Sequence, residues 1–146
     1  MKEIWLDYQP NSLAWPMLSL KVKSLIEDNL TGREGITWIK AKVNFIEEQR
    51  VYYIPRFAKK LDVLNRGKTM FVPGTEQIIK PFFALSKIQS LSVFHKPSLF
   101  WQIAPEMYIS QKLRKVLQME KVTGIEFENA LVVNNKKASA KNWFKN

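Results

Sequence analysis

The chain has 146 residues, of which 46% are hydrophobic and 25% charged; this composition is typical of one globular domain and excludes a wholly disordered protein. It contains no cysteine and one histidine, which excludes disulfides, thiolate metal sites and any site that needs two imidazoles. Lysine and arginine total 23 against 13 aspartates and glutamates, and the net charge of +10 predicts attraction to a polyanion or an acidic protein surface.

The first predicted element is a helix over residues 17–30. Pro16 suits the first helical position, because the missing backbone N–H costs nothing there and the φ of proline is already helical. Apolar residues at helical spacing form one stripe along this segment: Leu18, Val22, Leu25 and Ile26. Gly32 follows as a stop signal.

Residues 36–46 and 50–57 are predicted to form a β-hairpin. Alternation along the first strand places Ile39, Ala41, Val43 and Phe45 on one face and Lys40, Lys42 and Asn44 on the other. The polar residues 47–49 supply the turn. Pro55 has no N–H for a ladder, so it limits the second strand to an edge or ends its pairing.

Residues 58–103 carry a weaker pattern. We predict short strands at 69–72, 90–95 and 98–103, the first of them ended by the turn dipeptide Pro73-Gly74. In residues 75–85, apolar side chains surround Pro81, and both a broken helix and a loop fit this arrangement.

The C-terminal part predicts a helix, a tight turn and a strand in succession. Ser110 is a suitable N-cap for a helix that runs to about Glu120, with Leu113 and Leu117 on its apolar face. Thr123-Gly124 forms the turn, and Gly124 is expected to have a positive φ. Ile125 and Phe127 then begin a strand that is buried on one face.

The predicted fold class is α+β. Residues 1–134 form a single domain with a mainly antiparallel sheet, on which an N-terminal and a C-terminal helix pack. Residues 135–146 form a basic tail that is expected to fray unless Trp143 and Phe144 dock it.

No signal for catalysis, a cofactor or a metal is found. The glycine motifs that cradle nucleotides are missing from the sequence, and the neighbouring carboxylates lie where the pattern predicts solvent. His95 lies among apolar residues, which favours a packed histidine over a general base. Neither a secretory signal nor an apolar run of about 20 residues is visible, so we expect a cytoplasmic protein without a membrane partner.

The segment 50–68 is the most basic stretch before the tail. It holds six basic residues and one acid, and Tyr52, Tyr53 and Phe57 lie among them. Interleaved cations and aromatic rings are typical of single-stranded nucleic-acid binding, and the face that carries Trp38, Lys40 and Lys42 has the same character. However, about half of these aromatic side chains are needed to form the buried face of the sheet, and no RNA-binding sequence signature accompanies them. Nucleic-acid binding is therefore the alternative function.

Residues 99–128 resemble the C-terminal signature of a family of bacterial immunity proteins in polymorphic-toxin loci, the family first described from a Myxococcus protein. Chains of this family tend to end with an apolar strand, a helix capped by serine, and then Thr-Gly-hydrophobic-x-Phe. The matching positions here are Ile109, Ser110, Leu113, Leu117, Thr123, Gly124, Ile125 and Phe127. These residues form a structural motif, so the resemblance implies scaffold at these positions and not an interface.

The resemblance implies that the protein binds a cognate secreted toxin domain in the cytoplasm and blocks it by occlusion, with no cofactor and no catalysis. The positive charge then predicts a partner with an acidic face, which makes a nuclease the less favoured target. For the toxin-facing surface we predict Arg50, Tyr52, Tyr53, Arg56, Lys59, Lys60, Arg66 and Lys68, with whichever tyrosine points outward as the anchor. A solvated basic edge that discourages aggregation is the alternative interpretation of this segment.

Overall fold

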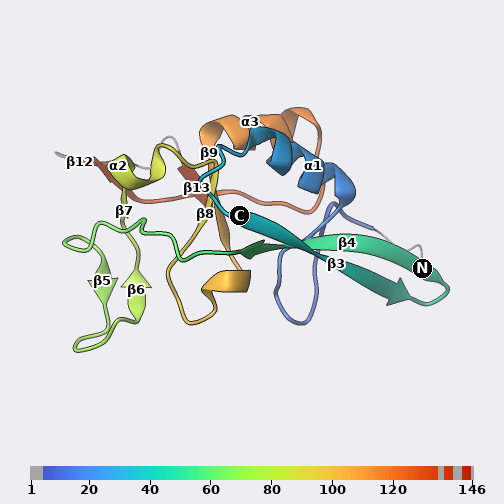
Figure 1. Ribbon diagram of the computed structural model, residues 1–146, viewed down its shortest axis with the longest axis horizontal. Coiled ribbons are helices and arrows are strands. Elements are labelled where there is room, and N and C mark those ends of the chain that lie inside the picture. Colours follow the sequence, from blue (N-terminus) through green and yellow to red (C-terminus); the bar gives the residue numbers. More distant parts are fainter. Residues whose placement is uncertain (1–4, 135–136, 140–142, 146) are drawn as a thin grey trace.

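The computed structural model describes residues 5–134, 137–139 and 143–145. Over these residues the fold is α+β with mostly antiparallel strands, as the sequence predicted (Figure 1). The exception is a parallel pair between β7 (Phe83–Ala84) and β11 (Val132–Asn134). Within the described part of the chain, no helix is long and apolar enough to cross a membrane.

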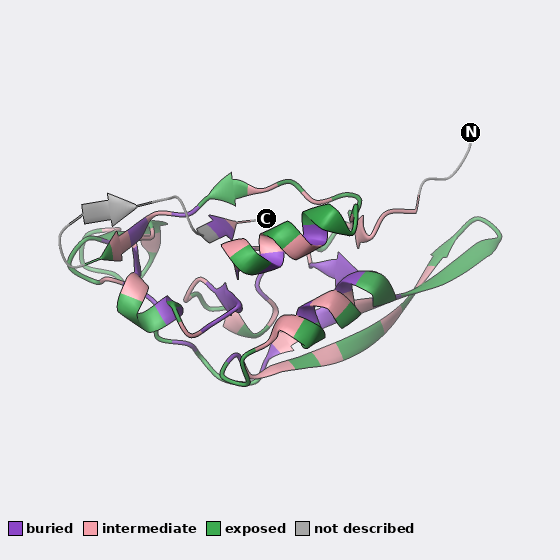
Figure 2. Ribbon diagram, turned by 90° about the horizontal axis from the view of Figure 1, so that it is seen from above, coloured by how far each residue is buried: buried purple, intermediate pink, exposed green. Residues whose placement is uncertain are grey.

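The longest element is the hairpin of β3 (Ile36–Phe45) and β4 (Glu48–Phe57), which confirms the predicted hairpin. The expectation for Pro55 is wrong, because the ladder continues past it to Phe57 and β4 lies between β2 and β3 in the sheet. Its ladder has ten cross-strand pairs. β1 (Tyr8–Gln9) and β2 (Met17–Leu18) extend the sheet on the β4 side, but β2 pairs with β4 only at Leu18 and Tyr53. The outer half of the hairpin therefore projects from the body as a two-stranded ribbon (Figure 2). We call residues 42–51 the arm.

The N-terminal helix starts later than the sequence predicted. α1 spans Leu20–Asn29, and the Oγ of Ser19 caps it by accepting a hydrogen bond from Val22 N–H. Pro16 does not begin the helix, because Met17 and Leu18 are extended and buried in β2. Serine is a preferred N-cap residue, so the position of Ser19 indicates the start of this helix better than the position of Pro16 does.

A second sheet has the strand order β10-β13-β9-β8, from β8 (Val93–His95), β9 (Met107–Ser110), β10 (Glu128–Asn129) and β13 (Trp143–Lys145). Ser110 ends β9 and caps α3 (Gln111–Met119), on which Leu113 and Leu117 are buried. Gly124 has a φ of 82°, which confirms the predicted turn conformation.

One prediction for the C-terminal part is wrong. Ile125 and Phe127 are half-buried but not in a strand, because pairing begins only at β10, where β13 supplies a partner. Of the two alternatives for the tail, docking applies at its end: β13 lies between β9 and β10, and Phe144 is buried. β12 (Lys137–Ser139) pairs with β11. Residues 135–136, 140–142 and 146 of the predicted tail lie outside the described residues.

The middle of the chain consists of short elements. β5 (Met70–Phe71) pairs with β6 (Ile78–Lys80), and β7 leads into α2 (Leu85–Ile88), so residues 75–85 are neither a broken helix nor a plain loop. The strand predicted at 98–103 is wrong, because Trp101–Ile103 form the short 3-10 helix η1. No strand of the described chain pairs with this segment, so an extended backbone here would lack ladder hydrogen bonds.

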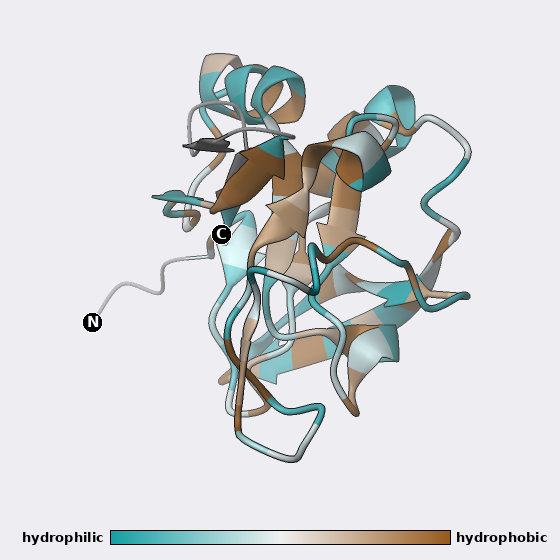
Figure 3. Ribbon diagram, turned by 90° about the vertical axis from the view of Figure 1, so that its left-hand side faces the viewer, coloured by the Kyte–Doolittle hydropathy of each residue, from teal (hydrophilic) through white to brown (hydrophobic). Residues whose placement is uncertain are grey.

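The main core lies between the helices and the second sheet, where Figure 3 shows the apolar strands gathered. Phe83, Phe94 and Tyr108 form its aromatic centre, with the Phe83 ring 4.9 Å from Phe94 and 4.5 Å from Tyr108. A smaller cluster of Met17, Tyr52 and Ile54 lies under the base of the hairpin. The burial of apolar surface in such clusters is the main favourable contribution to the stability of a chain of this size.

Candidate functional site

The segment predicted as one binding surface is divided between two parts of the molecule. Its residues Arg50, Tyr52, Tyr53 and Arg56 belong to β4, whereas Lys59, Lys60, Arg66 and Lys68 follow the hairpin in the loops beyond it. Among the latter, Lys60 and Arg66 line a groove. The side chain of Lys59 instead lies across Gly35, and Lys68 is exposed outside the groove.

The two tyrosines of β4 point to opposite faces of the hairpin. Tyr52 is 3% exposed, and its hydroxyl donates a hydrogen bond of 2.8 Å to the carbonyl oxygen of Leu6. Burial raises the pKa of this hydroxyl. Tyr53 retains part of its surface, with the Lys23 ammonium 5.2 Å from its ring centre. Of the two candidate anchors, only Tyr53 is therefore accessible.

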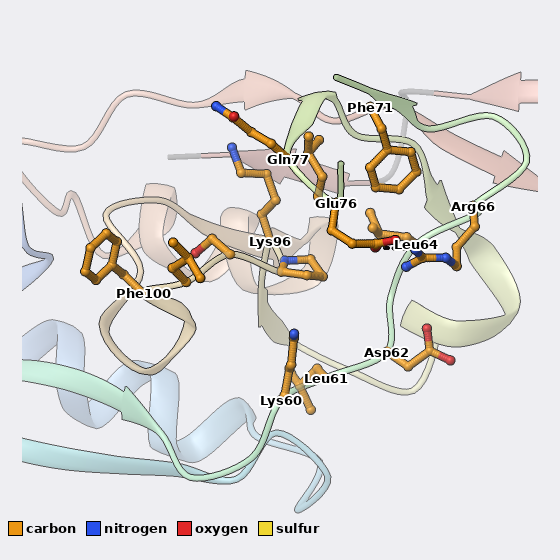
Figure 4. Close-up of a pocket in the computed structure, with 14 residues that line it drawn as sticks. Lys60, Leu61, Asp62, Leu64, Arg66, Phe71, Glu76, Gln77, Lys96 and Phe100 are labelled. Carbon is orange, nitrogen blue, oxygen red and sulfur yellow. Dashed lines mark hydrogen bonds and ion pairs between the residues drawn. The ribbon is translucent and has the colours of Figure 1, made fainter. Parts of the chain in front are cut away.

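The groove has a volume of about 840 Å³ and is built from three segments, residues 60–66, 71–78 and 96–100 (Figure 4). Its apolar lining comes from Leu61, Leu64, Phe71, Ile78 and Pro97. Leu99 and Phe100 lie at one end, 93% and 75% exposed. A cavity of this size is within the range of roughly 300–1,000 Å³ that is usual for ligand pockets.

The charges along the groove do not balance. The carboxylate of Asp62 accepts from the Lys87 ammonium at 2.9 Å, and Glu76 forms an ion pair with Arg66. Lys60 and Lys96 form no ion pair with any residue that the structure describes. Two lysines that line the groove are thus left without an ionic partner among the described residues.

His95 lies behind the groove and joins two of its segments. It is fully buried, with its ring 4.6 Å from that of Phe57. Burial and the nearby Lys60 charge lower its pKa, so the imidazole is neutral at pH 7. In the tautomer with hydrogen on Nδ1, this nitrogen donates to the Lys96 carbonyl and Nε2 accepts from Leu61 N–H, both at 3.3 Å. The histidine is therefore packed, as the sequence favoured.

The arm carries a second exposed apolar surface at its tip. Ile46 and Glu47 form a two-residue turn between the strands, and Ile46 has a φ of 52°. Ile46 is 83% exposed and the adjacent Phe45 is 53% exposed. A β-branched residue at positive φ is uncommon and costs roughly 1–2 kcal/mol relative to an ordinary turn residue.

The acid at the base of the tip is held in place. The indole N–H of Trp5 donates to Glu48 at 2.6 Å, and Arg50 lies 3.8 Å from the same carboxylate oxygen and over the Trp5 ring. Glu47 remains exposed beside Ile46. The tip therefore combines an apolar pair with one solvated carboxylate.

The residues of the C-terminal motif lie away from both surfaces. Ser110 caps the start of α3, and Leu113 and Leu117 are the buried residues of this helix. Thr123 N–H donates to Asp7 at 2.9 Å, and a Cβ on Gly124 would lie 2.4 Å from the Tyr8 carbonyl oxygen. These contacts attach the N-terminal segment to the turn after α3, which is a scaffold role.

Sequence reasoning missed Leu99 and Phe100, because it assigned residues 98–103 to a strand, and it did not single out Lys96. The available signal was the adjacent pair Leu99-Phe100, which does not alternate and would expose one apolar side chain in a strand. Within the described ranges, no group of three or more His, Asp or Glu side chains could hold a metal ion.

No known protein family, curated protein or solved structure matches the chain. The argument for function therefore depends on the geometry of the groove and the arm.

Proposed function

We propose that this protein binds a partner protein and neutralises it by occlusion, as an immunity protein does with its cognate toxin domain. The observation that carries the proposal is the tip of the arm, where Phe45 and Ile46 are exposed at the end of a projecting hairpin. An interface needs a few apolar anchors that fill pockets on the partner.

The tip is costly for the unbound protein. Asparagine or glycine would adopt the positive φ of Ile46 with less strain and would expose no large apolar side chain. Backbone strain of this kind clusters at functional sites. Insertion of Phe45 and Ile46 into an apolar cleft would offset this cost by removing their surface from water.

Cationic side chains along the hairpin favour an acidic rim around that cleft. Lys42 in the arm and Lys40 just before it are exposed on one strand, and Arg50 is exposed on the other. Together with the net charge of +10, they would speed the encounter with an acidic partner and disfavour basic ones.

Nucleic-acid binding receives less support from the same residues. Trp38 is half-buried, with the Lys23 ammonium 5.7 Å from its ring centre, and Tyr52 is buried. Neither ring presents an open face on which a base stacks, and such stacking is a main source of affinity for single strands.

The test uses the C-terminal domain encoded by the adjacent gene as the probe. We expect this domain to form a complex with the whole chain, and Ile46→Gly to weaken the complex by about tenfold or more. Met119→Ala is the matched control, because Met119 is 80% exposed on α3, away from the arm. Calorimetric titration of the three proteins measures the effect.

Two results would contradict the proposal. One is equal affinity of the parent and the Ile46→Gly variant for the domain, or no complex at all. The other is binding of random single-stranded RNA that falls steeply with salt, since phosphate contacts give such a dependence. The second result would favour the nucleic-acid alternative.

A further inference from the structure

We propose that the groove between residues 60–66, 71–78 and 96–100 is a binding site for an acidic peptide segment that also carries apolar side chains. In this assignment, carboxylates of the segment lie beside Lys60 and Lys96, and its apolar side chains contact the groove lining and Phe100. The proposal goes beyond the neutralising function, because it concerns a surface other than the arm.

The apolar part of the argument is the pair Leu99 and Phe100. Both side chains line the groove beside its other apolar residues and are mostly exposed. In Figure 4, Phe100 lies at one end of the groove and Phe71 at the other, with Lys60 and Lys96 between them. Exposed apolar side chains that continue an apolar cavity are typical of an interaction site.

The charged part of the argument is the imbalance of the groove. Asp62 and Glu76 are neutralised by Lys87 and Arg66, so they do not attract a cationic ligand. Lys60 and Lys96 remain unpaired within the described chain, and His95 behind them is neutral. An ammonium beside an apolar lining attracts an anion more strongly than an ammonium in bulk water does, because the local dielectric constant is lower.

The lining also distinguishes a peptide from a nucleic acid. Its apolar residues are mostly aliphatic, from Leu61 and Leu64 to Ile78 and Leu99, and these contact leucine-like side chains better than they stack on bases. The groove is partly open to solvent, so the side chains of a peptide segment can reach its lining. A volume of about 840 Å³ accommodates several side chains of such a segment.

Three blocked hexapeptides test the two requirements separately: alternating glutamate and leucine, alternating glutamate and serine, and alternating lysine and leucine. The first has both charge and apolar character, and each control lacks one of them. We expect the glutamate–leucine peptide to bind the whole chain about tenfold more tightly than either control. Amide chemical shifts should move at residues 60–64 and 96–100.

Matched variants then locate the site. Lys60→Gln with Lys96→Gln should weaken binding about fivefold or more, and Leu99→Ser should weaken it as well. The controls are Lys112→Gln with Lys115→Gln, which remove the same charge from exposed positions on α3, and Met119→Ser. All substituted residues are at least partly exposed, so folding is preserved.

The proposal is overturned if the glutamate–serine peptide binds as well as the glutamate–leucine peptide, or if the α3 variants lose as much affinity as the groove variants. Tighter binding of a thymidine hexanucleotide at the same residues would overturn it in favour of nucleic acid. If the groove variants no longer bind the peptide but still bind the domain encoded by the adjacent gene, the groove is a peptide site that the neutralising function does not use.

Discussion

The arm and the groove present exposed apolar side chains on two different kinds of scaffold. The arm is one hairpin, whose ladder runs without interruption from Ile36 and Phe57 to Phe45 and Glu48. The groove is assembled from loops and two- or three-residue strands that are distant in sequence. The hydrogen bond between Leu61 and His95, for example, joins residues that are 34 positions apart. Local sequence therefore dictates the arm, whereas the groove depends on the whole core.

The largest expected effect tests that dependence at the centre of the core. Phe83→Ala should lower the free energy of unfolding by about 3–5 kcal/mol, because it leaves a cavity beside Phe94 and Tyr108. Urea unfolding measures this change. Ile79→Ala, at an exposed position in β6, is the control and should cost less than about 0.5 kcal/mol. A loss below about 1 kcal/mol for Phe83→Ala would show that the groove rests on something other than this core.

The next prediction concerns the joint between the two regions. Glu34 is fully buried just before β3, and its carboxylate accepts hydrogen bonds from Ser92 N–H at 2.6 Å and Thr31 N–H at 2.9 Å. Burial alone would raise its pKa, but these bonds outweigh burial and lower the pKa below its ordinary value. Glu34→Gln should cost about 2–3 kcal/mol, because an amide nitrogen then faces backbone donors.

The depressed pKa of Glu34 also fixes the pH dependence. The stabilisation is fully present above the unfolded-state pKa and is lost as the pH falls through the lower folded-state pKa. Urea unfolding between pH 7 and pH 3 should therefore show a steeper acid loss for the parent than for Glu34→Gln. Parallel curves for the two proteins would contradict this role of Glu34.

A smaller effect is expected at the turn that attaches the N-terminal segment. Gly124→Ala places a Cβ 2.4 Å from the Tyr8 carbonyl oxygen at a φ of 82°, and should cost about 2 kcal/mol or more. Gly74→Ala is the matched control, since Gly74 has a similar φ of 75° and open space around it. Its cost should be limited to backbone strain of about 1 kcal/mol. Equal losses in thermal unfolding would mean that the contact with Tyr8 contributes nothing.

Elements with a strong local signal were predictable from the sequence. The alternation of residues 36–57, the cap at Ser110 and the positive φ of Gly124 follow from side-chain periodicity, a hydroxyl acceptor and the missing Cβ of glycine. Partners distant in sequence decided the rest. Met17 and Leu18 form a strand because Tyr8, Gln9 and Tyr53 pair with them.

The same reason explains what was missed at the groove. Residues 98–103 have strand-like composition, but no described strand pairs with them, and the chain turns into η1. His95 connects the backbone at Leu61 with that at Lys96 through two hydrogen bonds, which no local pattern indicates. Within the predicted surface, alternation correctly separated Tyr52 from Tyr53 but did not indicate which face of the hairpin is covered.

The smallest expected effect is a gain in stability at the tip of the arm. Ile46→Gly removes a left-handed strain of roughly 1–2 kcal/mol, and the greater freedom of glycine in the unfolded chain offsets part of it, about 0.5–1 kcal/mol. The free energy of unfolding should therefore rise by up to about 1 kcal/mol. Ile46→Asn should give a similar gain, because asparagine tolerates this conformation. Ile46→Ala separates strain from exposure: it removes the exposed side chain and keeps the unfavourable φ, so no gain is expected. If all three variants were equally stable, or if Ile46→Gly were less stable than the parent, isoleucine would not be strained in this turn. The conformational cost of Ile46, which supports its proposed role as an anchor, would then be absent.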